Sequence, residues 1–367
     1  MQVSSYSTRI AAVGEHARLL GIDAVLVTPG PDLQYLTGYD AIPLERLTCL
    51  VVPGEGQAAI VVPRLERLAA QASPIGDLGI DIRTWGETED PSALVASLIP
   101  GARRVGLDNH MWAEKVLRLR DAMPHAEQVL AGEVISNLRM RKDAAEVDAL
   151  LSAGAAIDRV HDRVAGLLRP GRTEREVGAD IADAILTEGH IRVDFVIVAS
   201  GPNGASPHHE VSDRVIERGD AVVVDIGGTM PDGYRSDCTR TYSVGFAPGA
   251  FLDRYRVLQQ AQAAAVDWAR AGVTCESVDA AARDVMDAEG LADLFIHRTG
   301  HGIGLETHED PYIVMGNTLT LEPGMAFSIE PGFYCEGEFG ARIEDIVIAT
   351  DAGVLLANNG THDLVVT

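Results

Sequence analysis

The second half of the chain contains a duplication. Residues 169–189 and 270–290 share Arg, Gly, Thr, Val, Ala, Asp, Glu and Gly at a constant offset of 101 residues. The first stretch reads as a helix that begins with a capping box made by Thr173 and Glu176. The repeat predicts that residues 137–367 hold two copies of one unit, a helix followed by a hairpin, related by an approximate twofold axis.

The match continues into apolar strands, each of which carries an acid. Asp225 follows the same glycine-bounded apolar pattern as Glu330, and Asp237 matches Glu344 in a second pair of strands. Chance similarity in an alanine-rich chain can account for the helices but not for the matched acids. Each copy is therefore expected to carry one carboxylate on each arm of its hairpin.

Four acids in such strands need a partner. Burying an unpaired carboxylate costs several kcal/mol, and a turn at residues 231–233 brings Asp225 and Asp237 to one face of a hairpin. Either Asp alone is better explained by a shared proton or by turn capping. Together with Glu330 and Glu344 they carry four negative charges, which match two divalent cations, so the set predicts a metal site.

A histidine in the second copy is a fifth candidate ligand. His301 lies in a Gly-His-Gly-Ile-Gly stretch, whose glycines let the backbone pass close to a site. A dinucleotide-binding loop is a weak alternative, because the spacing is G-x-G-x-G and no helix signal follows. One imidazole with four carboxylates suits manganese or cobalt, with iron or zinc as alternatives. Two such metals, roughly 3.5–4 Å apart, make a nucleophile of water at neutral pH, so we expect amide hydrolysis.

Other residues near these acids are candidates for contacts with a substrate. His208 lies in a loop with His209 as a near rival, and His308 follows the expected ligand histidine by seven residues. Histidine can donate to a developing oxyanion or pass a proton to a leaving nitrogen, although each alone is more often a satisfied loop residue. Arg342 alternates with Glu344 on one strand face and can orient that ligand; a simple salt bridge is the alternative.

The first part of the chain lacks such a cluster. Strand-like and helix-like segments alternate there, which predicts an α/β domain at residues 1–135, followed by the second domain at 136–367. The expected strands cover residues 23–28, 47–53, 57–63, 81–86 and 103–109, and the expected helices cover residues 64–72, 91–98 and 111–123. A polar stretch and a long amphipathic helix come next, so the boundary is expected within 132–142.

The composition limits the binding partners and the cellular compartment that we expect for this chain. The 54 acidic and 30 basic residues give a formal net charge of −24, which repels phosphate backbones and argues against nucleic acid. Four separated cysteines form no C-x-x-C pair, so a reducing compartment is expected rather than a disulfide framework. No segment approaches the roughly 20 apolar residues of a membrane span, and residues 1–14 do not read as a secretory signal. We expect a soluble, cytoplasmic protein.

These motifs resemble the pita-bread metallopeptidases. The resemblance covers nearly the whole chain and rests on Val-Val-Val-Asp225-Ile-Gly-Gly, Ser-Asp237-Cys-Thr-Arg-Thr, Gly-His301-Gly-Ile-Gly, Ser-Ile-Glu330-Pro-Gly and Gly-Ala-Arg-Ile-Glu344-Asp. The loop that ends at His208 and the stretch at residues 31–39 are similar to the Xaa-Pro branch, which holds prolidase and aminopeptidase P.

The resemblance implies a creatinase-like α/β N-terminal domain, an α+β pita-bread catalytic domain, two divalent metal ions, a proline-containing di- or oligopeptide substrate and a homodimer. It gives His208 and His308 contacts with the substrate and the transition state. It makes Glu330 both a ligand and the proton acceptor. Cys238 departs from the pattern, since that position is more often Met, and we expect no catalytic role for it.

Several activities on this fold are alternatives. Xaa-Pro dipeptidase is the first expectation, because the compact N-terminal domain resembles bacterial prolidases slightly better, and aminopeptidase P is the second. Creatinase and non-catalytic peptidase-like scaffolds lack the ligand set that is complete here. Methionine aminopeptidase normally lacks an N-terminal domain of this kind. A metal-dependent lyase is a further alternative.

Overall fold

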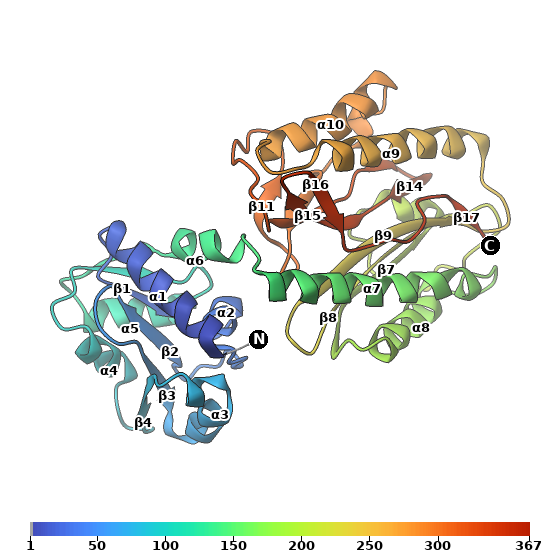
Figure 1. The fold of residues 1–367 in the computed structure, drawn as a ribbon. Coiled ribbons are helices and arrows are strands. Elements are labelled where there is room, and N and C mark those ends of the chain that lie inside the picture. The colour runs from blue at the N-terminus through green and yellow to red at the C-terminus, as the bar shows by residue number, and fades with distance from the viewer. Residues whose placement is uncertain (1–2) are drawn as a thin grey trace. The chain divides into compact units, whose positions relative to one another are not determined.

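The computed structural model describes residues 3–367, which divide into two compact units at Arg139 (Figure 1). Each unit has its own sheets and its own hydrophobic clusters. No helix within residues 3–367 combines the length and the apolar character needed to cross a bilayer.

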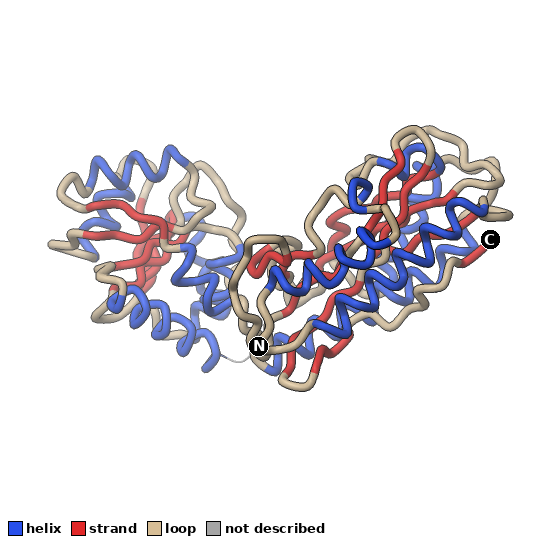
Figure 2. Tube along the Cα trace, turned by 90° about the horizontal axis from the view of Figure 1, so that it is seen from above, coloured by secondary structure: helices blue, strands red, loops and turns tan. Residues whose placement is uncertain are grey.

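The first unit is built on one mixed six-stranded sheet of order β4-β3-β2-β1-β5-β6. Its strands lie between helices on both sides (Figure 2). The strands are β1 (Ala24–Val27), β2 (Cys49–Pro53), β3 (Ala59–Pro63), β4 (Asp81–Trp85), β5 (Arg104–Leu107) and β6 (Glu127–Leu130). The helices are α1 (Val3–Leu19), α2 (Pro31–Thr37), α3 (Arg67–Ala72), α4 (Pro91–Leu98), α5 (Ala113–Ala122) and α6 (Gly132–Arg139).

The five predicted strands and three predicted helices of this unit are confirmed, with small shifts at their ends. Four elements were not predicted, namely α1, α2, β6 and α6. In α1 the buried positions Arg9, Val13, Gly14 and Ala17 hold only one large apolar side chain, so the helix lacks a clear apolar stripe.

The second unit packs four long helices against its sheets. In Figure 1, α9 (Gly249–Trp268) and α10 (Cys275–Ala288) lie on one side of the strands, and α7 (Ala144–Leu167) and α8 (Glu174–Thr187) lie on the other. Each helix pair packs on its own hydrophobic cluster. The expected capping box of α8 is present, and α8 and α10 both have 14 residues. The helices of the duplication therefore form as the repeat predicts.

The strands of this unit form three sheets. A four-stranded sheet of order β17-β9-β8-β7 joins three strands of the first copy to the last strand of the chain, and the second copy has a five-stranded sheet of order β11-β10-β12-β15-β16 and the pair β13-β14. Their bounds are β7 (Arg192–Ser200), β8 (Ala221–Thr229), β9 (Arg235–Ser243), β10 (Gly300–Gly302), β11 (Glu309–Ile313), β12 (Ala326–Ile329), β13 (Gly332–Cys335), β14 (Phe339–Arg342), β15 (Asp345–Thr350), β16 (Gly353–Leu356) and β17 (Val365–Val366).

The two copies differ in how their acids sit on the strands. Asp225 and Asp237 lie within β8 and β9, as expected. Glu330 comes directly after β12 and Glu344 directly before β15, so the second pair lies just outside the strands rather than on the arms of one hairpin. The chain between those two acids forms its own short hairpin, β13–β14, which interrupts the longer one.

Candidate metal centre

A cavity of about 980 Å³ in the second unit gathers the predicted site residues. Its lining comes from both copies and includes strands, loops and the start of α8. It contains every residue singled out above as a ligand or substrate contact: Asp225, Asp237, His301, Glu330 and Glu344, together with His208, His308 and Arg342.

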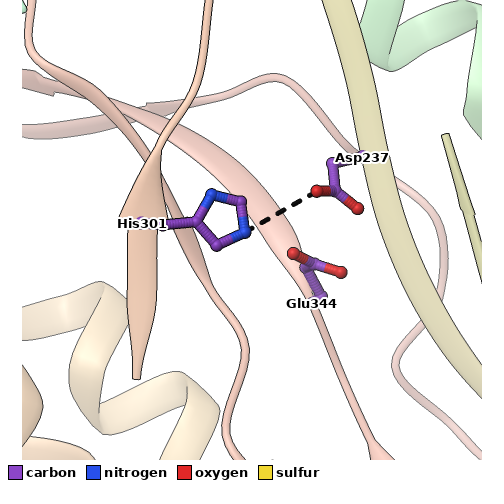
Figure 3. A group of neighbouring side chains, drawn as sticks. All are labelled: Asp237, His301 and Glu344. Atoms are coloured by element: carbon purple, nitrogen blue, oxygen red, sulfur yellow. Dashed lines mark ion pairs between the residues drawn. The ribbon is translucent and has the colours of Figure 1, made fainter. Parts of the chain in front are cut away.

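Three of the expected ligands form the core of this cluster. Asp237, His301 and Glu344 each offer an atom, and these atoms lie within 4.8 Å of one another. Figure 3 shows the His301 ring and both carboxylates pointing toward one another, with His301 Nε2 3.7 Å from Asp237 Oδ2. All three are at most 3% exposed, so the arrangement buries two acids beside a single imidazole.

The His301 ring is oriented to present a lone pair to the acids. Its Nδ1 lies 3.1 Å from the backbone oxygen of Gly302, and its backbone N–H donates to Ser328 Oγ at 3.0 Å. Burial, aided by the neighbouring His308, lowers the pKa of His301 to about 3. A neutral ring that donates through Nδ1 has Nε2 free to act as a metal ligand.

Glu330 adjoins this group. Its Oε1 lies 3.3 Å from His301 Nε2 and accepts a hydrogen bond from Ser328 Oγ at 3.1 Å. Burial raises the pKa of Glu330 to about 7. The other carboxylate oxygen, Oε2, is 4.0 Å from Nε of Arg342, so the Glu330 side chain lies between His301 and a cation.

Asp225 has one oxygen engaged and one orphaned. Its Oδ2 pairs with Nη2 of Arg342 at 2.5 Å. Its Oδ1 is buried and has no hydrogen-bond partner within residues 3–367. A buried carboxylate oxygen without a donor is costly, and a bound cation would satisfy it.

Repulsion between the acids also favours a bound cation. Burial and then the charges of Glu344, Asp225 and Glu330 raise the pKa of Asp237 well above its usual range. Burial and the charges of Glu330 and Asp225 do the same to Glu344. Divalent cations would relieve this repulsion and restore the charged forms. Donor types, orphaned oxygen and electrostatics all fit divalent metal.

Arg342 contacts a different acid from the one expected. It pairs directly with Asp225, whereas it reaches Glu344 through Thr239: its Nε donates to Thr239 Oγ1 at 3.1 Å, and that hydroxyl donates to Glu344 Oε2 at 2.7 Å. The sequence did not point to Thr239, because a threonine on a strand carries no signal of its own.

The two candidate histidines line the cavity from loops. His208 and His308 are both exposed, and the His308 ring centroid lies 4.0 Å from that of His301. Burial and the charge of Arg298 lower the pKa of His308. By contrast, Nε2 of His209 lies 2.8 Å from Oε2 of the buried Glu174, so His209 is held by the protein, whereas His208 has no hydrogen-bond partner among residues 3–367.

The cavity also holds a cation that the sequence did not single out. Arg298, three residues before His301, lines the cavity with its guanidinium carbon 4.4 Å from the ring centroid of Tyr312. Throughout the described chain, no carboxylate lies within ion-pair distance of it. Its closeness in sequence to His301, an expected ligand, was the one available signal.

The sequence models of two known domains match this chain. The model of Metallopeptidase family M24 matches residues 148–351, and that of the Creatinase/Prolidase N-terminal domain matches residues 9–141. The chain is a metallopeptidase of family M24. The matched catalytic region holds all five expected ligands, and the fold of its structural relatives is the pita-bread fold expected from the resemblance.

Relatives of this M24 chain match it along its whole length. It is 52% identical over 362 residues, 98% of this chain and 96% of the relative, to a protein of Mycobacterium tuberculosis named probable dipeptidase PepE. The crystal structure of dipeptidase PepE from Mycobacterium ulcerans has 53% identity and a TM-score of 0.96, covering 100% of this chain and 99% of that one. A prolidase structure from Thermococcus sibiricus has 36% identity and a TM-score of 0.92, covering 100% of both chains.

Proposed function

We propose that this chain is an Xaa-Pro dipeptidase, which hydrolyses the bond between a first residue and a C-terminal proline. The observation that carries the proposal is a cavity that holds both a cluster of metal-ligand type and a cation, Arg298, with no carboxylate partner in the described chain. The relatives named dipeptidase and prolidase support the same reading.

We propose that two divalent metal ions, manganese first and cobalt, iron or zinc as alternatives, are held by the five expected ligands: Asp225, Asp237, His301, Glu330 and Glu344. When bound, such ions supply Lewis acidity and lower the pKa of water. The orphaned oxygen of Asp225 and the lone pair of His301 support this ligand set.

The chain's own residues would then move the protons. The bond before proline is a tertiary amide, so its nitrogen has no N–H and must be protonated as it leaves. His308 and His208 face the cavity beside the ligands and are proposed to stabilise the developing oxyanion and to deliver this proton. Glu330, whose Oε1 also lies close to His301, is proposed to accept the proton of the nucleophile.

The position of Arg298 favours a dipeptide over a longer peptide. A dipeptide ends in a carboxylate directly after the scissile bond, and a guanidinium binds a carboxylate through two parallel hydrogen bonds. The other arginine near the acids, Arg342, already contacts Asp225, Tyr334 and Thr239. Aminopeptidase P, which acts on longer Xaa-Pro peptides, is the alternative.

A peptide panel tests the proposal. The manganese-loaded protein is assayed with Ala-Pro, Ala-Pro-Ala, Ala-Ala and Met-Ala-Ser. We expect the highest kcat/KM for Ala-Pro. Preference for Ala-Pro-Ala would favour aminopeptidase P, and cleavage of Met-Ala-Ser with neither proline peptide touched would remove the Xaa-Pro assignment.

We also propose, from the family resemblance, that the protein is a cytoplasmic homodimer. Light scattering on the purified protein would measure its mass against the 39.1 kDa of one chain.

A further inference from the structure

One further buried carboxylate, which is not among the expected metal ligands, is bonded to a residue that lines the cavity. Glu174 is the first residue of α8 and is 0% exposed. Buried acids without a cation partner are rare unless several donors satisfy both oxygens. Glu174 meets that condition, because one loop provides all of its donors.

The donors come from both ends of the loop at residues 200–212. Oε1 accepts hydrogen bonds from the backbone N–H and Oγ of Ser200, at 2.8 and 2.7 Å, and from Asn203 Nδ2 at 3.0 Å. Oε2 accepts from His209 Nε2 at 2.8 Å and from the N–H and Oγ of Ser212, at 3.2 and 2.5 Å. Although burial opposes the charge, these bonds hold the pKa of Glu174 at about 2.

The same loop is fixed to the strand that carries Arg342. A Cβ on Gly340 would lie 1.9 Å from the backbone oxygen of Gly204, so the two backbones touch without room for a side chain. Both terminal nitrogens of Arg342 lie 3.4 Å from the backbone oxygen of Pro207. His208, directly after Pro207, is therefore held between this strand on one side and the Glu174–His209 bond on the other.

We propose that Glu174 is a positioning residue for the peptidase reaction, which sets the place of His208 in the cavity by clamping residues 200–212. Glu174 does not touch the substrate and acts through His208. The inference rests on the role proposed above for His208, and it adds a residue on which that role depends.

The chemistry of the clamp singles out the carboxylate. A carboxylate accepts on both oxygens, whereas an amide has one accepting oxygen and one NH2 donor. In Glu174→Gln the NH2 group would face donors on one side, either those of Ser200 and Asn203 or those of His209 and Ser212. One end of the loop would then be released, and His208 would lose its fixed position.

A double-mutant cycle with the metal-loaded full chain tests this. Glu174→Gln is made alone and together with His208→Ala, and kcat and KM are measured with the best peptide of the panel. The control is Glu176→Gln on the same helical turn, which retains the capping box, because Gln also serves at that position. Metal content is measured by elemental analysis in every variant.

We expect Glu174→Gln to lower kcat about tenfold or more with metal content retained, and Glu176→Gln to leave kcat unchanged. In the His208→Ala background, Glu174→Gln should lower kcat by less than twofold, since the two changes remove the same contribution. An equal loss in both backgrounds, or loss of metal with Glu174→Gln, would overturn the proposal.

Ser212→Ala provides a second test of the proposal if Glu174→Gln does not fold. It removes the 2.5 Å hydrogen bond to Glu174 and leaves the carboxylate in place. We expect it to give a smaller loss of kcat that also disappears in the His208→Ala background, and a loss that persists there would contradict the clamp. The cycle can use whichever peptide the enzyme cleaves, so an error in the proline assignment would not decide its outcome.

Discussion

Thr239 donates a hydrogen bond of 2.7 Å from its Oγ1 to Oε2 of Glu344, and the two residues also pair as an isolated antiparallel bridge. Thr239 lies on β9 of the first copy, whereas Glu344 directly precedes β15 of the second. The two copies of the repeated unit are therefore joined at Glu344, an expected ligand. The Thr239 hydroxyl also accepts a hydrogen bond from Nε of Arg342.

This junction predicts that Thr239→Val weakens metal binding. The change removes the hydroxyl, so Glu344 Oε2 loses a donor and Arg342 Nε loses an acceptor. We expect a loss in metal affinity of about 10–100-fold, measured by competition with a chelator. Thr241→Val is the matched control, because the hydrogen bonds that its hydroxyl makes within the described residues all go to the backbone of Arg342. Equal affinity in the two variants would show that Thr239 does not support the site.

His208 and His308 are predicted to act on the substrate and not to bind the metal. His208→Ala and His308→Ala should each lower kcat by about 10²–10⁴-fold with unchanged metal content. The exposed His125 of the first unit is the control, and His125→Ala should leave kcat unchanged. Loss of metal together with kcat would place the histidine among the ligands.

Glu330 predicts a specific pH dependence of the metal-free protein. Burial raises its pKa from 4.5 to about 7, so its contribution to stability is complete below the unfolded value and is lost as pH rises through about 7. The buried His161 and His301 and the half-buried His297, whose pKa values are lowered to about 3, act in the opposite direction, but only up to about pH 6.5, where histidines of the unfolded chain also become neutral. The thermal midpoint should therefore fall between about pH 6.5 and 8.

Two comparisons isolate this effect. Glu330→Gln removes one titrating group, so the fall in midpoint over the same pH interval should be smaller. Manganese added at pH 8 should raise the midpoint of the unaltered protein, because the metal binds the charged acids of the folded state. A slope that Glu330→Gln leaves unchanged would show that the carboxyl does not titrate in this range.

Arg298 predicts recognition of the substrate carboxylate. Arg298→Gln should raise KM for Ala-Pro by about tenfold or more, since one charge-assisted hydrogen-bonded contact contributes about 1.5–3 kcal/mol. The C-terminal amide of Ala-Pro is the control substrate, and its kcat/KM should change little. Equal losses for acid and amide would show that the guanidinium does not bind the carboxylate.

Replacing either of two glycines, Gly300 beside His301 or Gly166 in α7, with alanine is predicted to change the stability of the protein in opposite directions. A Cβ on Gly300 would lie 1.8 Å from the backbone oxygen of Ser328, so Gly300→Ala should destabilise the protein by about 3 kcal/mol or more. Gly166, near the end of α7, has open space around it, so Gly166→Ala should stabilise the helix by about 0.5–1 kcal/mol. Chemical unfolding of both variants measures the difference, and similar stabilities would contradict the packing.

The helices of the repeat and the candidate ligands could be predicted because their sequence patterns are local. Acids inside apolar strands and a capping box at Thr173 are local patterns whose explanation is contained within a few residues. The resemblance then ordered the five candidates along the chain. That the two copies superpose with Asp225 on Glu330 stays a prediction.

What the sequence could not indicate depends on contacts between distant segments. Glu174 looked like an ordinary acid in the first turn of a helix, yet its partners lie 26 to 38 residues further on. Arg298 is distinguished by the absence of an ion pair in the described chain, which only the fold determines. The break in the second hairpin likewise follows from how the strands pair, not from their apolar pattern.

Titration of manganese into the metal-free protein, with hydrolysis of Ala-Pro followed at each step, tests the central claim most directly. We predict no hydrolysis before metal is added and a rise that saturates at two metal ions per chain, with Glu344→Gln reducing the bound metal and the exposed Glu336→Gln leaving it unchanged. Full hydrolysis of Ala-Pro by protein that elemental analysis shows to be free of metal would contradict the account.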